Sequence, residues 1–392
     1  MSVKLLHIIG ARPQFIKYFP IQQAIDRARA SMQLIPAMLR QAPHHTPDPS
    51  PITSLLVHTG QHYDYRMSQI FFDELGIRPP DYHLDVGSGS HGQQTALVQQ
   101  RAEEVLIKEK PDIVIVYGDT NSTLGGALAA AKLHIPVAHV EAGLRSFNKR
   151  MPEEINRILT DHVSTYLFCP SEPAVENLCR EGLTTNSSPL ADNATPDIDH
   201  PLITQVGDVM YDMLLFAVVI AEEKSRIIDQ RGITPKGYDL LTLHRAETTD
   251  DPLRLEEVIA FVNEISAHTP VIFPMHPRMA KAYAAAHNPF AKNIRIIEPL
   301  GYFDLLTVLK NARRLMTDSG GMQKEAYWLQ IPCITLRDET EWIETVQSGW
   351  NILWRDYRGA HHPQSQPSAY GDGHAAENMI TMLLERTLTK YV

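Results

Sequence analysis

The chain has 392 residues, and its 36 basic and 46 acidic side chains give a formal net charge of −10. This balance excludes a generally basic nucleic-acid-binding surface, so an anionic ligand would have to be held by local cations or backbone amides. The 43% hydrophobic content suffices for a large core, and the length predicts two domains.

The cysteine count and the apolar runs bear on the compartment. Cys169, Cys179 and Cys333 are too few for a disulfide framework, and their spacing fits no common zinc site. They favour a reducing compartment, and we expect the cytoplasm. The longest notable apolar run, residues 213–221, is shorter than the roughly 20 residues that span a bilayer. Residues 4–10 are predicted to form a strand and not a signal peptide, because His7 interrupts them and no cleavage site follows.

Short apolar runs recur along the chain, each followed by a polar or glycine-containing loop and a helical pattern. In the first half they lie at residues 4–10, 54–60, 112–119 and 136–143. In the second half they lie at residues 239–247, 270–278, 313–321 and 332–339. Nearly continuous apolar strands that alternate with helices are typical of parallel sheets covered on both faces. The sequence therefore predicts an α/β protein with two Rossmann-like domains that face each other.

Two loop-rich segments help to place the domain limits. Residues 184–201 are rich in Pro, Asn, Asp, Ser and Thr, which predicts an exposed loop before the boundary. The proline-rich residues 36–51 predict a surface insertion between the first helix and the second strand. We expect an N-terminal domain at 1–207, a C-terminal domain at 208–375 and a closing helix at 376–392.

Polar residues that follow the strands are the first candidates for a ligand site, because ligands bind beyond the carboxyl ends of parallel strands. Arg12 and Lys17 stand near the start of the first helix, where free amides already favour anions, although both could be solvated surface cations. Asp119 and Glu141 each directly follow an apolar strand, and this position favours a functional role.

Glu153 is open to two interpretations. It lies in the first turn of a helix that Pro152 opens, where a carboxylate stabilises the helix dipole by roughly 0.3–1 kcal/mol. Several carboxylates in one site would instead push their pKa values apart and supply an acid and a base near neutral pH. Spacing alone does not decide between the two.

The second half predicts an anion-binding site. His244 ends one strand, and His276 and Arg278 end another. Converging histidine and arginine side chains would complete a diphosphate site. His244 could also simply fill a polar pocket, and the set could be ordinary loop residues.

A glycine-containing loop follows a third strand of this half. Ser319, Gly320 and Gly321 precede a helix, so backbone amides could approach a phosphate closely while the helix N-terminus favours its charge. Glu325 lies in that helix and could accept hydrogen bonds from two ribose hydroxyls, or it could simply be exposed. With the carboxylates of the first half, these residues indicate an enzyme for a phosphate-bearing, nucleotide-linked substrate, and no metal-ligand cluster accompanies them.

The chain resembles the non-hydrolysing UDP-N-acetylglucosamine 2-epimerase family in an ordered set of motifs: GARPQFIK, TGQHYD, YGDTNST, HVEAGLRS, MPEEINRILTDH, LHRAE, MHPR and TDSGGMQKEA. The resemblance implies a glycosyltransferase-B-like architecture, in which a cleft between two Rossmann domains closes over the sugar nucleotide. It also implies a homodimer that interconverts UDP-GlcNAc and UDP-ManNAc for cell-surface polysaccharide synthesis, with no cofactor and no metal.

The resemblance also implies residue roles. Asp119, Glu141, Glu153 and His244 match the catalytic residues, and Arg12 and Lys17 match contacts on the diphosphate side. Ser319, Gly320 and Gly321 match the phosphate loop, and Glu325 matches the ribose-binding acid. In the family reaction a carboxylate removes the C2 proton as UDP leaves C1, and UDP then adds back to the glycal while the proton returns on the other face.

Some positions depart from the familiar pattern and keep the substrate open. The family tends to read RREN where this chain has residues 245–248, an aromatic residue near Leu305 and an arginine at Trp342. The GARPQFIK, HRAE and ETEW variants also resemble the branch that acts on UDP-2,3-diacetamido-2,3-dideoxy-glucuronate. Rival functions are a glycosyltransferase of the same architecture, a non-catalytic sugar-nucleotide sensor and a hydrolysing epimerase.

Overall fold

The computed structural model describes residues 2–39, 52–61, 77–183, 196–359, 363 and 368–388. The chain packs into two compact units, one formed by Met1–Met213 with Tyr370–Val392 and the other by Leu214–Ala369. The first crossing lies within α7 (Val209–Lys224). The domain limits and the cleft inferred from the sequence stay predictions.

The first unit contains a parallel sheet in the order β3-β2-β1-β4-β5-β6-β7. Its strands are buried almost throughout because helices cover both faces, which explains their nearly continuous apolar sequences. Their bounds are β1 (Val3–Ile9), β2 (Ile52–His58), β3 (Tyr82–His83), β4 (Ile113–Tyr117), β5 (Val137–Val140), β6 (Tyr166–Cys169) and β7 (Leu202–Gln205).

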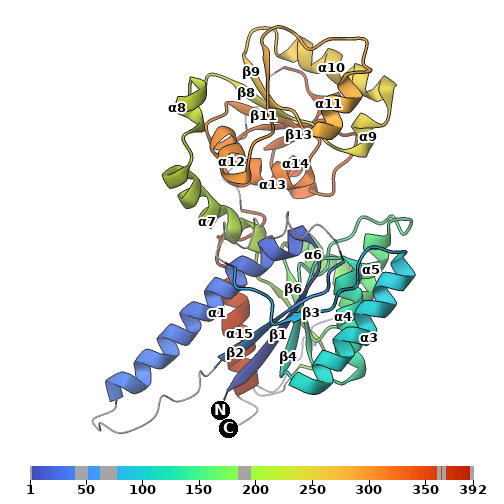
Figure 1. The fold of residues 1–392 in the computed structure, drawn as a ribbon, viewed down its shortest axis with the longest axis vertical. Helices are drawn as coiled ribbons and strands as arrows, with labels where there is room; N and C mark the ends of the chain where they lie inside the picture. Colours follow the sequence, from blue (N-terminus) through green and yellow to red (C-terminus); the bar gives the residue numbers. More distant parts are fainter. Residues whose placement is uncertain are drawn as a thin grey trace. The chain divides into compact units, whose positions relative to one another are not determined.

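Helices lie on both sides of this sheet (Figure 1). α1 (Arg12–Leu39) and α15 (Ala375–Leu388) pack side by side, and α3 (His91–Glu109), α4 (Asn121–Lys132) and α5 (Pro152–His162) lie on the other side. α6 (Glu172–Arg180) follows β6. α3 and α4 approach closely because Gly125 lacks a side chain: a Cβ there would lie 2.8 Å from Val98 Cγ1. Serine and threonine capping boxes at Ser90 and Thr120 begin these two helices.

One sequence expectation fails at the end of α1. A loop is expected from residue 36, but the helix continues to Leu39. Alanine, methionine and leucine follow Pro36, and these strong helix formers extend the helix past the proline. The rest of the expected insertion, residues 40–51, and residues 184–195 of the other expected loop lie outside the described residues.

The second unit contains a parallel sheet in the order β10-β9-β8-β11-β12-β13. Successive strand residues point to opposite faces, so Leu241 and Met316 pack in one core with α10, while Leu240 and Leu315 pack in another with α12. The strands are β8 (Asp239–Thr242), β9 (Val271–Pro274), β10 (Ile294–Ile297), β11 (Arg314–Thr317), β12 (Cys333–Thr335) and β13 (Asn351–Leu353). The helices are α8 (Ile227–Arg231), α9 (Ala246–Thr249), α10 (Pro252–Ile265), α11 (Pro277–Tyr283), α12 (Tyr302–Lys310), α13 (Gly320–Trp328), α14 (Ile343–Gln347) and the short 3-10 turn η1 (Trp354–Asp356).

The predicted α/β class with two parallel sheets is confirmed. In each sheet the strand order reverses once, between β1 and β4 in the first unit and between β8 and β11 in the second. Loops beyond such a reversal diverge and leave room for a ligand. The loops that follow these four strands, together with the helices after those loops, carry most of the candidate residues. No helix in the described ranges is long and apolar enough to cross a membrane.

Candidate active site

The loops after β1, β2 and β4 are locked together at the carboxyl edge of the first sheet. A Cβ at Gly10 would lie 2.0 Å from Thr59 Oγ1 and 2.2 Å from Ser122 Oγ, so only glycine fits there. Gln14 accepts hydrogen bonds from the backbone N–H of Gly10 and of the next residue, and its Nε2 donates to the Tyr117 carbonyl at 2.8 Å. The first loop therefore has one fixed conformation against the end of β4.

Lys17 and Glu141 form an ion pair at this edge. Only 11% of the Lys17 side chain and 10% of the Glu141 side chain are exposed. Burial by itself lowers the pKa of Lys17, but Glu141, with Asp119 and Asp208 adding to it, raises that pKa above its ordinary value. The lysine is therefore a fixed positive charge beside a carboxylate.

The backbone around this pair adopts an uncommon conformation. Glu141 follows β5 with φ of 72°, in the left-handed region that residues with a Cβ rarely adopt. Gly118 follows β4 with φ of 62°, and a Cβ there would lie 3.1 Å from Lys17 Nζ and 3.5 Å from Glu141 Oε2. A left-handed non-glycine residue at a strand end is typical of functional sites, where the surrounding structure holds the strain.

Asp119 lies next to Gly118 and is held from α5. Its carboxylate pairs with Arg157, and its carbonyl accepts a hydrogen bond from Asn156 Nδ2 at 2.9 Å. A third of the Asp119 side chain remains exposed, at 33%. Asp119 thus pairs with a cation that also contacts Glu154, and it is still accessible to solvent.

The two adjacent glutamates of α5 have different environments. Glu154 is buried, and its oxygens accept the backbone N–H groups of Ser146 and Phe147, each at 2.9 Å. Glu153 points into solvent, and within the described part of the chain it makes no hydrogen bond or ion pair. The structure therefore gathers Lys17, Glu141 and Asp119 but does not bring Glu153 into contact with them. Arg12 is the first residue of α1, and its side chain lies outside the described residues.

In the second unit a buried carboxylate organises the loop after β8. Asp318 follows β11 and is fully buried. Its oxygens accept the backbone N–H groups of His244 at 3.1 Å and Arg245 at 3.0 Å, and lie 3.3 Å from His244 Nδ1. The His244 side chain is 44% exposed. The imidazole therefore contacts the buried carboxylate of Asp318, and its other side is exposed to solvent.

His276 and Arg278 begin α11 nearby. The rings of His244 and His276 lie 6.1 Å apart, centroid to centroid. Burial, with His244 and Arg278 adding to it, lowers the pKa of His276, which favours the neutral ring. Arg278 is 45% exposed and pairs with Asp250 at 2.6 Å, so it is a surface ion pair in this structure.

The glycine loop caps α13. Ser319 Oγ accepts the backbone N–H of Met322 at 3.4 Å, as an N-cap residue does. A Cβ at Gly320 would lie 2.7 Å from Glu341 Oε1 and 3.4 Å from Arg245 Nη2, so Gly320 allows the approach of two charged side chains. Gly321 is exposed, and a Cβ there would have nothing within 4 Å.

Glu325 lies further along α13 and is not simply an exposed helix residue. Burial raises the pKa of Glu325 to about 7, despite the Tyr302 hydroxyl that donates to its Oε1 at 3.1 Å. With a pKa near neutral pH, this carboxyl group can accept hydrogen bonds when ionised and can donate one when protonated. This environment fits a contact to ligand hydroxyls.

Metal and cofactor chemistry was expected to be absent, and this stays a prediction. In the described ranges no three His, Cys, Asp or Glu side chains lie close enough to hold a metal ion. The three cysteines are unpaired, with Cys169 and Cys333 buried.

One sheet edge thus carries a lysine–carboxylate pair, and the other carries a glycine-containing loop at the N-terminus of α13. A model of the UDP-N-acetylglucosamine 2-epimerase family matches residues 47–384. The chain belongs to this family. The assignment predicted from the ordered motifs is therefore confirmed.

Individual members of the epimerase family match over most of the chain. A Methanococcus maripaludis protein named UDP-N-acetylglucosamine 2-epimerase homolog is 48% identical over 358 residues, covering 90% of this chain and 88% of that protein. The Pseudomonas aeruginosa UDP-2,3-diacetamido-2,3-dideoxy-D-glucuronate 2-epimerase is 45% identical over 352 residues, with the same coverage of 90% and 88%. The crystal structure of the Methanocaldococcus jannaschii UDP-GlcNAc 2-epimerase in complex with UDP-GlcNAc and UDP matches with a TM-score of 0.72 and 39% identity, covering 98% of this chain and 100% of that one. The fold is glycosyltransferase-B-like.

Sequence reasoning missed several residues at the carboxyl edges of the two sheets. Asp318 stands directly before Ser319 at a strand end, which is the signal that could have found it. Gln14 and Tyr302 give no such signal, because their roles depend on partners far away in the sequence.

Proposed function

We propose that this epimerase-family chain interconverts UDP-GlcNAc and UDP-ManNAc by elimination and re-addition of UDP. The observation that carries the proposal is the family match over residues 47–384. The Lys17–Glu141 pair supports it independently, because it fixes a carboxylate, a group that can accept a proton, at the carboxyl edge of the first sheet, where parallel sheets bind ligands.

The proposed reaction begins with removal of the C2 proton by a carboxylate. The C–H electron pair forms the C1–C2 double bond, and the C1–oxygen bond breaks with its electrons going to UDP. UDP then re-adds at C1 while a proton is delivered to the other face of C2. Acid and base groups are needed on both faces, and we propose that Asp119, Glu141 and Glu153 share this work with His244. Glu153 is the least supported, since it is exposed and contacts none of the others.

We propose that the second unit holds UDP. The phosphates would bind at Ser319, Gly320 and Gly321, where the N-terminus of α13 favours anions. His276 and Arg278 would add positive charge, and Arg278 would exchange Asp250 for phosphate. Glu325 would bind the ribose hydroxyls. Arg12 and Lys17 would contact the diphosphate from the first unit.

A second candidate substrate is UDP-2,3-diacetamido-2,3-dideoxy-glucuronate. The 45% identity to the Pseudomonas aeruginosa enzyme favours it. The charged side chains beside Gly320 also favour it, because Arg245 lies 3.6 Å from Glu341 and could exchange that carboxylate for one on a sugar.

The deciding experiment incubates the purified protein with each UDP-sugar alone and follows the product by NMR. A C2 epimer formed without acceptor supports an epimerase, and the substrate that is turned over identifies the branch. Binding without turnover would support a sensor, free ManNAc and UDP would support a hydrolysing enzyme, and turnover only with an acceptor would support a glycosyltransferase.

We further propose that the protein is a cytoplasmic homodimer that supplies cell-surface polysaccharide synthesis. Met151, the N-cap of α5, and Ile155 and Leu159 on the helix recur at a spacing of four residues and are exposed by 39%, 45% and 44%. An exposed apolar helix face supports contact with a second copy. Light scattering should give twice the chain mass of 44.1 kDa, and a monomer mass would overturn this proposal.

A further inference from the structure

A buried carboxylate holds the chain on both sides of Glu141. Asp161, on α5, is fully buried, and its Oδ1 lies 2.6 Å from Nδ1 of His139, two residues before Glu141. Its Oδ2 accepts the backbone N–H of Gly143, two residues after Glu141, at 3.2 Å. The left-handed residue therefore lies between two contacts to one side chain.

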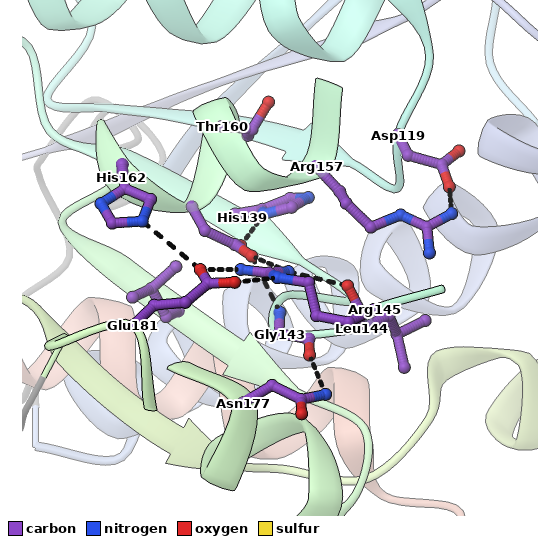
Figure 2. Close-up of polar contacts among 12 residues, drawn as sticks. Asp119, His139, Gly143, Leu144, Arg145, Arg157, Thr160, His162, Asn177 and Glu181 are labelled. Atoms are coloured by element: carbon purple, nitrogen blue, oxygen red, sulfur yellow. Dashed lines mark hydrogen bonds and ion pairs between the residues drawn. The ribbon is translucent and has the colours of Figure 1, made fainter. Parts of the chain in front are cut away.

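The other partners of Asp161 make it a rigid anchor. Arg145 Nη1 donates to Asp161 Oδ2 at 2.7 Å, and the same guanidinium makes two bonds of 2.7 Å to Glu181. Figure 2 shows this chain of contacts from Arg145 to Glu181 and on to His162. Burial by itself raises the pKa of Asp161, but His139 and Arg145 outweigh it and hold the pKa below its ordinary value. The anchor is thus a carboxylate.

His139 faces an acceptor at each ring nitrogen. Nδ1 meets the Asp161 carboxylate, and Nε2 lies 2.7 Å from the carbonyl oxygen of Gly118. A carboxylate and a carbonyl can only accept, and a neutral imidazole has a single N–H. Both contacts are hydrogen bonds only if the ring carries two protons. The contact at Nε2 fixes Gly118, which lies against the Lys17–Glu141 pair and precedes Asp119.

His7, on β1, provides a contrast inside the same sheet. It is also fully buried, but its Nδ1 faces the Tyr117 hydroxyl at 2.7 Å, which can donate as well as accept. Burial, with Arg78 and Arg29 adding to it, lowers the pKa of His7 to about 3. The two buried histidines of this sheet thus have different partners: His7 faces a hydroxyl that can donate, and His139 faces two groups that only accept.

We propose that Asp161 and His139 form a buried ion pair that positions Glu141 and the Gly118 carbonyl for the reaction. Both are positioning residues: neither is assigned a contact with substrate. The inference rests on the proposed role of Glu141 in epimerisation. The charged or titratable groups that face the pair are Arg145 and, on β6, Cys169, whose thiol pKa burial raises.

The first test reads the ionisation of His139 in the wild-type protein, independently of activity. In 15N-histidine-labelled protein at pH 7, both ring nitrogens of His139 should carry a proton, whereas only one ring nitrogen of His7 should carry one. His139→Gln and His7→Gln variants assign the signals. A single protonated nitrogen on His139 at pH 7 would overturn the proposal. If a variant does not fold, backbone-to-side-chain correlations in uniformly 13C,15N-labelled wild-type protein assign the signals instead.

The second test separates positioning from general stability. Asp161→Asn keeps the shape but removes the charge, and it should lower kcat by about 10- to 100-fold with KM changed by less than about threefold, because small misplacements of reacting groups cost this much. The control is Asp239→Asn, at an equally buried aspartate of the second unit that pairs with Arg313 and Arg314. It should lower the melting temperature and leave kcat within about twofold.

The outcomes separate this inference from the proposed function. If the wild-type protein is inactive but His139 is doubly protonated, the proposed epimerase function is refuted and the proposed ion pair is supported. An active wild type whose Asp161→Asn variant keeps full kcat would refute the positioning role and keep the epimerase.

Discussion

The carboxyl edge of the first sheet carries largely buried ion pairs, whereas that of the second carries exposed histidine and arginine side chains near the buried Asp318. In the first unit Lys17 and Glu141 are about a tenth exposed, and His139 and Asp161 are fully buried. In the second unit the side chain of His244 is 44% exposed and that of Arg278 45%.

We interpret this difference in side-chain exposure as a difference in function. Buried pairs fix the geometry and the ionisation of a few groups, as proton transfer requires. Exposed cations attract an anion from solution and exchange their surface partners for it, which gives binding that depends on salt. The first edge is therefore expected to govern turnover and the second to govern affinity for UDP.

The strongest test of this division is Glu141→Gln. The change keeps the shape and removes the basicity, so kcat should fall by at least about 100-fold while UDP affinity stays within about threefold. Steady-state kinetics and calorimetry measure the two quantities. Glu176→Gln, at an exposed glutamate of α6 that is 53% accessible, is the control and should behave as the wild type. A near-normal kcat for Glu141→Gln would remove Glu141 from the catalytic set.

A smaller effect is expected from Gly118→Ala. The new Cβ would lie 3.1 Å from Lys17 Nζ, so the Lys17–Glu141 pair must shift and kcat should fall by about tenfold. The matched control is Gly232→Ala, with φ of 58° and nothing within 4 Å of the new Cβ. Both variants should lose about 1 kcal/mol of stability from the left-handed backbone, and equal losses of kcat would contradict the account.

UDP binding at the second edge should depend on salt. Arg278→Ala should weaken UDP binding by about fivefold at low salt, and less at high salt, because an exposed charge is screened. Titration calorimetry at two salt concentrations, with a chelator present, measures this and tests metal-free binding. Arg180→Ala, at an exposed arginine of the first unit that also pairs with an acid, should change nothing. Loss of binding on chelation would refute the metal-free claim.

The smallest effect on turnover is expected at Glu325, where the readout is stability. Its pKa of about 7 in the folded chain lies above the ordinary value of 4.5, so folding favours the protonated form. The free energy of unfolding should therefore fall as pH rises from about 4.5 to about 7 and then level off. Glu325→Gln should remove this fall and be more stable than the wild type at pH 8, by on the order of 1 kcal/mol or more. Denaturant melts at pH 5 and pH 8 test this. An equal change in the free energy of unfolding between the two pH values in both proteins would contradict it.

The fold could be predicted from the sequence because buried parallel strands leave continuous apolar runs. β4, β8 and β11 lie within the predicted runs, and β1 begins one residue before its run. The short edge strand β3, of two residues, and β13, of three, could not be predicted in this way, because they carry too few residues for a pattern. The helical continuation to Leu39 was missed because Pro36 suggested a break.

The sequence predicted the residues of the candidate site better than the contacts between them. Lys17, Asp119 and Glu141 were found because they follow strand ends. The pairing of Lys17 with Glu141 depends on the left-handed backbone of Gly118 and Glu141, which no local pattern reveals. Glu153 and Glu154 are adjacent acids in one helical turn, and only the fold decides that Glu154 is the buried one.

The central claim, elimination and re-addition of UDP with proton transfer at the carboxyl edge of the first sheet, is tested most directly by NMR of the reaction in heavy water. Each turnover should take a proton from a group that exchanges with solvent, so the epimeric product should carry deuterium at C2. The C1–oxygen bond to UDP should also break transiently, which positional isotope exchange detects. Product that forms without deuterium at C2 would indicate a hydride-type route and contradict the account.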